Sequence, residues 1–406
     1  MVKSPDKPEV FLDQDLDTDE VTLNFGPQHP ATHGTLRIEL LLEGETVKRA
    51  IPHIGYLHTG FEKLAEHLNY NQFITLSDRM NYLSPLNNNI GFALAVEKLL
   101  DIDVTDRCKY VRVLLCELTR ISDHLVSIGT AAMDLGAFTV FLYFFEKREI
   151  LYDIFEMITG TRLTTSFTRI GGMMNDISDD AIDAIRKFIQ EIPPVIKDVE
   201  TLLNKNKIWI GRTRDIGVID AEEAMDFGFT GPCLRASGIS WDLRKKEPYL
   251  VYDRLDFDIP VAENGDVYDR YWVRMEEMKE SLKMCSQVLD ELPGGPINID
   301  DPKIILPSKD DVYGSMEALI HHFEITMEHR GLRPPKGEIY SATEVPNGEL
   351  GFFIVSDGTQ RPYRVRVRPP SLINYQAFPK MLEGGMLSDS VACLGSLNII
   401  AGELDR

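Results

Sequence analysis

The sequence predicts an α+β protein that is mainly α. Its 406 residues, 43% of them hydrophobic, can bury a large core. Apolar residues recur at helical spacing through the middle of the chain, whereas strand-like segments are found near its two ends. We therefore expect a helical core with a small N-terminal β-sheet and a C-terminal β meander.

The N-terminal part is expected to form an arm and a β subdomain. Residues 1–20 are acidic, contain proline and lack periodicity, which is typical of a flexible arm. Residues 21–60 contain three strand-like segments, and Glu43-Gly44-Glu45 joins the last two in the manner of a hairpin. These expected strands are 21–25, 36–45 and 46–55.

Residues 61–335 are expected to form the helical core. Apolar residues have helical spacing on both sides of a break at Pro85, and almost continuously from residue 105 to about 160. The segment 176–207 has an acidic start, a lysine-rich end and Pro193-Pro194 inside it, so we expect a pair of surface helices. Further helices are expected at 270–292 and 313–328.

Residues 336–406 are expected to form the β meander and a helical tail. The stretch 338–370 carries the clearest strand pattern in the chain. Turns at Pro346-Asn347-Gly348 and at Asp357-Gly358 divide it into three strands.

The charge of the chain limits its partners. A net charge of -21 would repel the phosphate backbone, which excludes nucleic acid as a partner. One basic run, RVRVR, places three arginines on one face of a strand. Because the chain is so acidic, we expect Arg364, Arg366 and Arg368 to form internal salt bridges or to contact another protein chain.

The five cysteines are scattered, and none forms a CxxC pair. This favours a reducing compartment over a disulfide framework or a thiolate metal cage. The N-terminus lacks the apolar segment of a secretory signal, and no apolar run approaches the roughly 18 to 20 residues of a membrane helix. If the protein works at a membrane, we expect partners to hold it there.

The segment 26–40 holds two histidines at four-residue spacing, His29 and His33. Two histidines at this spacing can share a metal on one helix face. Here two prolines and Gly34 prevent a normal helix, and the HExxH arrangement is absent. Two other interpretations stay open: rings that order the loop through backbone hydrogen bonds, and rings that transfer protons or bind a ligand.

Two further polar positions are candidate site residues. Tyr82 lies in a polar segment between two helices, where it could donate a hydrogen bond to a ligand or lie in the core. Asp134 interrupts an apolar helical segment, where a carboxylate needs a cation such as protonated histidine. The pairs Asp123-His124 and His321-His322 are expected on solvated helix faces.

Several motifs follow one another along the chain: GPQHPATHGTLR, PHIGYLHTGFEKLAEH, DRMNYLSPL, ALAVEKLL, TRLTTSFTRIGG and the terminal GELDR. In these motifs the sequence resembles the D-type subunit, also called the 49-kDa-type subunit, of the proton-pumping NADH:quinone oxidoreductase, respiratory complex I. The resemblance covers nearly the whole chain from about residue 21. It implies a core similar to the large subunit of nickel-iron hydrogenases, without the metal.

Two segments of the chain correspond to the metal-binding motifs of hydrogenases but lack their cysteines. The RxCGxC motif of hydrogenases corresponds to residues 79–84, with Asn81 and Ser84 where thiolates would stand. The C-terminal DPCxxC corresponds to Asn398 through Glu403. Nickel needs soft thiolate ligands there, so the resemblance implies a chain that binds no metal.

By the same resemblance, the former metal cavity holds the headgroup of a quinone. Tyr82 and His33 would hydrogen-bond and protonate it, with Asp134 as the carboxylate behind His33. His29 would order the loop, and His29 and Ser84 complete the set of candidates at the headgroup. Reduction to quinol takes two electrons and two protons, which tyrosine and protonated histidine are suited to donate.

The resemblance also implies the partners. Electrons would come from an iron-sulfur cluster in the adjacent B-type subunit, since this chain binds no cofactor alone. Further partners would be the C-type subunit and the other complex I subunits, including the membrane arm. The chain would lie peripherally on the cytoplasmic face of the bacterial inner membrane, and quinone reduction would be coupled to proton translocation.

Two positions depart from the pattern of many relatives. Thr59 stands where many have arginine in an LHRG segment, and Thr164 where many have histidine. Both changes remove a cationic or titratable group near the cluster. We therefore expect a lower, less pH-dependent cluster potential, which suits menaquinone as the substrate.

Two alternatives remain open from the sequence. A metal-containing, hydrogenase-like enzyme would contain bound nickel. A non-catalytic scaffold would keep quinone reduction in the assembled complex after Tyr82 or His33 is replaced.

Overall fold

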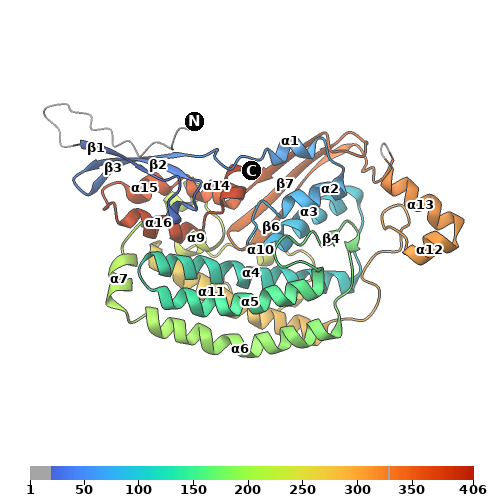
Figure 1. Cartoon of the computed structure of the whole chain (residues 1–406), viewed down its shortest axis with the longest axis horizontal. Helices are drawn as coiled ribbons and strands as arrows, with labels where there is room; N and C mark the ends of the chain where they lie inside the picture. Colours follow the sequence, from blue (N-terminus) through green and yellow to red (C-terminus); the bar gives the residue numbers. More distant parts are fainter. Residues whose placement is uncertain (1–19, 328–329) are drawn as a thin grey trace, which may run out of the picture.

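The structure, a computed structural model, describes residues 20–327 and 330–406. The arm predicted for residues 1–20 lies outside the described residues, apart from Glu20. A layer of long helices lies below two small sheets, and a pair of short helices projects at one end (Figure 1).

The N-terminal sheet confirms the three predicted strands. It is antiparallel in the order β1-β2-β3, with β1 at Glu20–Phe25, β2 at Arg37–Glu43 and β3 at Thr46–His53. The predicted hairpin turn lies at Gly44, where φ is +60°. Alternate side chains of β2 are buried, because side chains along a strand point to opposite faces. They are Ile38, Leu40 and Leu42.

Five long helices form the core. They are α3 (Pro85–Leu100), α4 (Asp106–Asp134), α5 (Phe138–Thr159), α6 (Asp179–Leu203) and α11 (Val267–Glu291). Helix α4 contacts α3, α5 and α11 and is buried along most of its length, so it is the central helix of the layer. Pro85 begins α3, where its missing N–H has no intrahelical partner to lose.

Helix α6 corrects one prediction. It is a single helix that continues through Pro193 and Pro194, whereas we expected two helices. Both prolines lie on its exposed face. The carbonyl groups that lose their N–H partners there can bond to water, which lowers the cost of proline inside the helix.

Shorter helices connect these elements. They are η1 (Pro30–Thr32), α1 (Phe61–Ala65), α2 (Tyr70–Ser77), α7 (Lys207–Thr213), α8 (Ala221–Asp226), α9 (Gly231–Ala236), α10 (Leu243–Lys246), η2 (Tyr252–Arg254), α12 (Lys309–Gly314) and α13 (Met316–Thr326). The helix expected at 313–328 is divided at Ser315, whose side chain accepts a hydrogen bond from the N–H of Ala318 and so begins α13.

The second three-stranded sheet confirms the predicted meander. Its order is β6-β7-β8, with β6 at Gly337–Val345, β7 at Gly348–Ser356 and β8 at Arg364–Arg368. Helix α3 packs against β6 and β7. A small hairpin, β4 (Thr168–Arg169) and β5 (Gly172–Met173), lies between α5 and α6 in the chain.

The arginines of β8 form the expected internal salt bridges. Arg364 lies 3.1 Å from Glu66 and Arg366 lies 3.8 Å from Glu62, both on α1 or directly after it. These salt bridges connect β8 to the N-terminal end of the helical core.

The helical tail consists of α14 (Pro370–Tyr375), α15 (Phe378–Leu382), α16 (Asp389–Leu397) and α17 (Ala401–Asp405). Helix α15 packs on β3, and α16 packs on α4. The structure confirms the mainly helical α+β class. Within the described residues, each helix is too short or too polar to cross a membrane.

Candidate functional site

The loop between β1 and β2 is ordered by His29. Its Nδ1 accepts a hydrogen bond from the N–H of Ala31 at 3.2 Å, and its ring packs on Phe25 with the ring centroids 4.6 Å apart. Gly26 has φ +79°, and a Cβ there would lie 2.1 Å from the carbonyl oxygen of Leu36. Glycine is therefore required where this loop closes.

His33 ends η1 in a left-handed conformation, with φ 54°. Its ring is exposed, and it has no hydrogen-bond partner among the described residues. Desolvation by surrounding protein nevertheless lowers the pKa of His33 below 6.5. His33 is thus a mainly neutral ring that is free to bind a ligand.

Asp134 is the last residue of α4, and its side chain is exposed. The expectation of a buried carboxylate is wrong, because the helix ends here and the chain turns at Gly136. Desolvation raises the pKa of Asp134, and the charge of His29 opposes that rise. No interaction between Asp134 and His33 is found in the part of the chain that the structure describes. Asp134 therefore interacts electrostatically with His29.

Tyr82 lies half-buried in the turn between α2 and α3. Its hydroxyl has no hydrogen-bond partner within residues 20–327 and 330–406. Burial and then the negative charge of Asp123 raise the pKa of Tyr82. The phenol is therefore held in its protonated form, with its O–H available as a donor.

Asp123, in the middle of α4, is fully buried and accepts hydrogen bonds from both segments that correspond to the metal-binding motifs of hydrogenases. The amide of Asn81 donates to one carboxylate oxygen at 3.3 Å, and the amide of Asn398 donates to the other at 2.6 Å. Asn398 also donates to the side-chain oxygen of Asn347 at 2.5 Å. Ser84, three residues after Asn81, is also buried, and its Oγ has no partner among the described residues.

This donor set does not fit nickel. Amide N–H groups that point at a carboxylate are hydrogen-bond donors, whereas nickel requires thiolate sulfur. All five cysteines are buried and free, and no group of three or more His, Cys, Asp and Glu in the described chain is arranged to hold a metal ion.

Glu403, in α17, is a second buried carboxyl group of this cluster. The backbone N–H of Ser371 donates to its Oε1 at 2.8 Å, while its Oε2 is buried with no partner among the described residues. Burial raises the pKa of Glu403 to about 7; hydrogen bonding from Ser371 opposes the rise, and the charge of Asp123 adds to it. Burial raises the pKa of Asp123 as well. The two carboxyl groups thus favour a bound proton.

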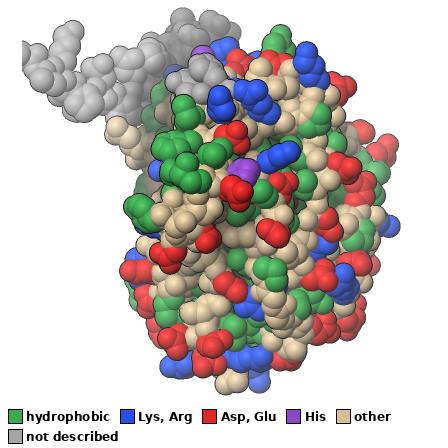
Figure 2. Space-filling view, turned by 90° about the vertical axis from the view of Figure 1, so that its right-hand side faces the viewer, with side chains coloured by type: hydrophobic (Ala, Val, Ile, Leu, Met, Phe, Trp, Pro, Cys, Tyr) green, Lys and Arg blue, Asp and Glu red, His purple; other side chains and the backbone are tan. Residues whose placement is uncertain are grey.

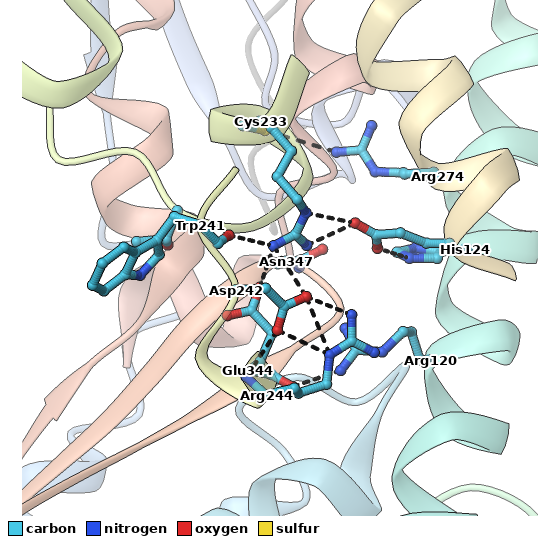
Figure 3. A network of polar contacts seen from close by, with 12 residues as sticks. Arg120, His124, Cys233, Trp241, Asp242, Arg244, Arg274, Glu344 and Asn347 are labelled. Atoms are coloured by element: carbon cyan, nitrogen blue, oxygen red, sulfur yellow. Dashed lines mark hydrogen bonds and ion pairs between the residues drawn. The ribbon is translucent and has the colours of Figure 1, made fainter. Parts of the chain in front are cut away.

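Next to Asp123 in the chain, His124 joins a network of buried ion pairs (Figure 3). Its Nε2 lies 2.8 Å from Glu277, which also accepts from Arg235 at 2.6 Å. Arg235 donates in addition to Glu344 at 2.9 Å. The remaining charged members are Glu117, Arg120, Asp242 and Arg244. The network connects α4, α9, α10, α11 and β6 in the interior.

His124 is a neutral ring in this network. Its Nδ1 is buried without a partner among the described residues, so a protonated ring would leave an unpaired N–H there. Burial lowers the pKa of His124, although Glu277 opposes this. Asp123 consequently lacks a full positive charge on its nearest neighbour.

Sequence reasoning missed Asp123 and His124. We expected them on a solvated face, but both are fully buried. The available signal was the apolar character of this helix on more than one face, which is typical of a helix at the centre of a bundle. Glu403 carried no such signal, because it lies in a short tail helix.

Large hydrophobic side chains are exposed at one end of the molecule, on α12 and α13. They are Tyr313, Met316, Ile320 and Phe323. Figure 2 faces this end and shows hydrophobic side chains gathered on one side, with acidic side chains scattered over the rest. Such exposed apolar surface is typical of a chain that contacts other proteins.

The fold and site define a class of protein: an acidic α+β protein with hydrogen-bonded carboxyl groups at its buried centre. The family model "Respiratory-chain NADH dehydrogenase, 49 Kd subunit" matches residues 134–406, more than half of the chain. The chain belongs to this family, that of the D-type subunit of NADH-quinone oxidoreductase, and is thus part of an oxidoreductase complex.

The similarity to individual relatives extends over nearly the whole chain. The D-type subunit of NADH-quinone oxidoreductase from Geotalea uraniireducens is 51% identical over 96% of this chain and 99% of its own length. The second D-type subunit of Rhizobium etli is 51% identical over 96% of both chains. The D-type subunit from a Wolbachia strain of Brugia malayi is 49% identical over 96% of this chain and 100% of its own length.

Proposed function

We propose that this chain forms the quinone-reduction site of the complex together with the B-type subunit. Tyr82 and His33 hydrogen-bond the quinone headgroup and protonate it as electrons arrive from the iron-sulfur cluster of that neighbour. The observation that carries this proposal is that both groups have no hydrogen-bond partner among the described residues, while each is partly desolvated.

The chemistry of the two groups suits the reaction. A quinone oxygen that gains negative charge needs donors within hydrogen-bond reach. The raised pKa of Tyr82 keeps its hydroxyl proton in place until that charge develops. The ring of His33 is neutral at rest. Its basicity rises as negative charge develops on the quinone beside it, so the ring can take up a proton and pass it to the quinone.

The open setting of His33 suits a site that is closed by a second protein chain. Two hollows of about 620 and about 700 Å³ lie elsewhere on the chain, around Tyr249 and around Leu332.

We assign the chain to the peripheral part of the complex on the cytoplasmic face of the inner membrane. Its partners there are the B-type and C-type subunits and the membrane arm, and quinone reduction is coupled to proton translocation.

The proposal is tested by Tyr82→Phe and His33→Ala in the assembled complex. Each is expected to lower NADH:quinone activity by about 100-fold or more, which is the usual contribution of a positioned proton donor. Electron transfer from NADH to an artificial acceptor is expected to stay unchanged and reports assembly. Retained quinone reduction in both variants would instead support a scaffold role and discard the site.

Menaquinone is the proposed substrate, because Thr59 and Thr164 are uncharged. Thr59 is exposed in the loop before α1, and Thr164 lies half-buried after α5. Redox titration of the neighbouring cluster at several pH values should give a low potential with a shallow pH slope. A steep slope would contradict this assignment.

A further inference from the structure

We propose that Asp123 and Glu403 form a second proton-binding site, which takes up a proton when Tyr82 gives its own to the quinone. This inference rests on the proposed function and extends it from the headgroup to the buried cluster behind it. The two carboxyl groups act through Tyr82 and do not contact the substrate.

The geometry of the cluster supports a shared site. Asn81 precedes Tyr82 directly and donates to Asp123 at 3.3 Å, and the side chain of Asn81 also lowers the pKa of Glu403. Helices α4 and α17 and the turn before α3 therefore meet at one point. A change of charge at one of these groups is felt by the other two.

The donors around the pair are too few for two negative charges. Asp123 accepts from the amides of Asn81 and Asn398, which are neutral. Glu403 accepts from the N–H of Ser371 through Oε1 only, and its Oε2 has no partner among the described residues. Two buried carboxylates with such partners are costly, and a proton on one of them removes most of the cost.

The charged groups that face the pair do not replace this proton. His124 adjoins Asp123 on α4, but burial lowers its pKa and favours the neutral ring. Arg274 of α11 lowers the pKa of Asp123 less than the two amides do, and Arg148 of α5 is a further cation whose charge interacts with Asp123. For Glu403, the charged neighbour is Asp123 itself, which adds to the rise of its pKa to about 7.

The coupling to Tyr82 is reciprocal. The negative charge of Asp123 raises the pKa of Tyr82, so a tyrosinate at Tyr82 must raise the proton affinity of the pair by the same free energy. When Tyr82 transfers its proton to the reduced quinone, the pair binds one proton from water. The total charge of Tyr82, Asp123 and Glu403 is then unchanged. When Tyr82 is protonated again, the pair releases its proton.

The test compares Glu403→Gln with wild type in the intact complex over a range of pH. In wild type, turnover should fall as the pair ionises with rising pH. Glutamine is permanently neutral, so this fall should be absent and the ratio of variant to wild-type kcat should rise about threefold from about pH 6 to about pH 8. Glu383→Gln, an exposed glutamate on the same tail, is the matched control and should leave the profile unchanged.

A second measurement does not depend on turnover. Infrared difference spectra of the wild-type complex, recorded on quinone reduction, should show a protonated carboxyl C=O band that shifts in D₂O. The band should be lost in Glu403→Gln and in Asp123→Asn. Its absence in wild type, or a pH-independent ratio of turnover in Glu403→Gln, would overturn the proposal. If Tyr82→Phe retained quinone reduction, the proposed function itself would fail, so the two failures are distinct.

Discussion

The carboxylate of Asp134 interacts with the ring of His29, four residues before the histidine that the sequence had paired with it. His29 is fixed by its hydrogen bond with the N–H of Ala31 and by its contact with Phe25. Asp134 thus joins the end of α4 to the ordered part of the loop. His33, at the exposed end of the same loop, is left free for a ligand.

We predict that Asp134 and His29 are coupled energetically and that Asp134 and His33 are not. In a double-mutant cycle on NADH:quinone kcat/KM, Asp134→Asn and His29→Gln should be non-additive by about 1 kcal/mol. Asp134→Asn and His33→Gln should add within about 0.5 kcal/mol, the error of independent sites. Coupling to His33 alone would mean that the loop rearranges in the complex.

We predict that the titration of His33 controls quinone affinity at mildly acidic pH. Desolvation lowers the pKa of His33, so its ring is neutral above about 6.5 and gains charge only below that value. A charged ring is the stronger donor to a quinone carbonyl, so KM for quinone should fall as the pH decreases below about 6.5.

This dependence should be absent in His33→Gln. His67→Gln, which changes a histidine between α1 and α2, should keep the wild-type curve. A KM that is flat with pH in wild type would show that His33 does not titrate beside the quinone.

Gly402 is predicted to hold the Tyr82 turn in place. A Cβ at Gly402 would lie 2.5 Å from the carbonyl oxygen of Arg79 and 2.8 Å from that of Met80. Gly402→Ala should therefore displace this turn and lower quinone reduction at least about tenfold, since small misplacements of reacting groups have large effects. Gly211→Ala, in α7 with open space around it, should have no effect.

The readout is NADH:quinone activity relative to electron transfer to an artificial acceptor. Equal loss of both would indicate failed assembly. Wild-type quinone activity in Gly402→Ala would contradict the proposed contact.

Periodic segments could be predicted from the sequence, and isolated polar residues could not. The strands around Gly44 and the helices on both sides of Asp134 follow from apolar spacing alone. The prolines of α6 misled the prediction, since the spacing of apolar residues continues through Pro193 and the exposed face tolerates it. Local patterns report which face of an element is buried.

The site itself depends on contacts between distant segments. Asp123 receives hydrogen bonds from Asn81, 42 residues earlier, and from Asn398, 275 residues later. Its charge and its place in a helix suggested a solvated face. Only the folded chain brings the two amides to it, so neither its hydrogen-bond partners nor the role that we propose for Glu403 could be read from spacing.

Arg235 contacts two carboxyl groups whose pKa values are shifted in opposite directions. Burial opposes the ionisation of Glu277, but Arg235 and His124 outweigh it and hold the pKa of Glu277 far below its usual value. Burial and the charge of Asp242 instead raise the pKa of Glu344. Glu277 is thus a charge that the fold requires, whereas Glu344 takes up a proton more readily than an ordinary glutamate.

Glu277→Gln should therefore destabilise the chain by about 3–5 kcal/mol, because Arg235 loses its main partner in the interior. Glu344→Gln should cost only about 1 kcal/mol, the scale of a single altered hydrogen bond. The measurement is the temperature or urea concentration at which each variant dissociates from the purified complex. The contribution of Glu277 is complete above its unfolded pKa of about 4.5 and is lost as the pH falls toward its folded value, so wild type should approach Glu277→Gln in acid. Equal stability of the two variants at neutral pH would show that the two carboxyl groups carry the same charge.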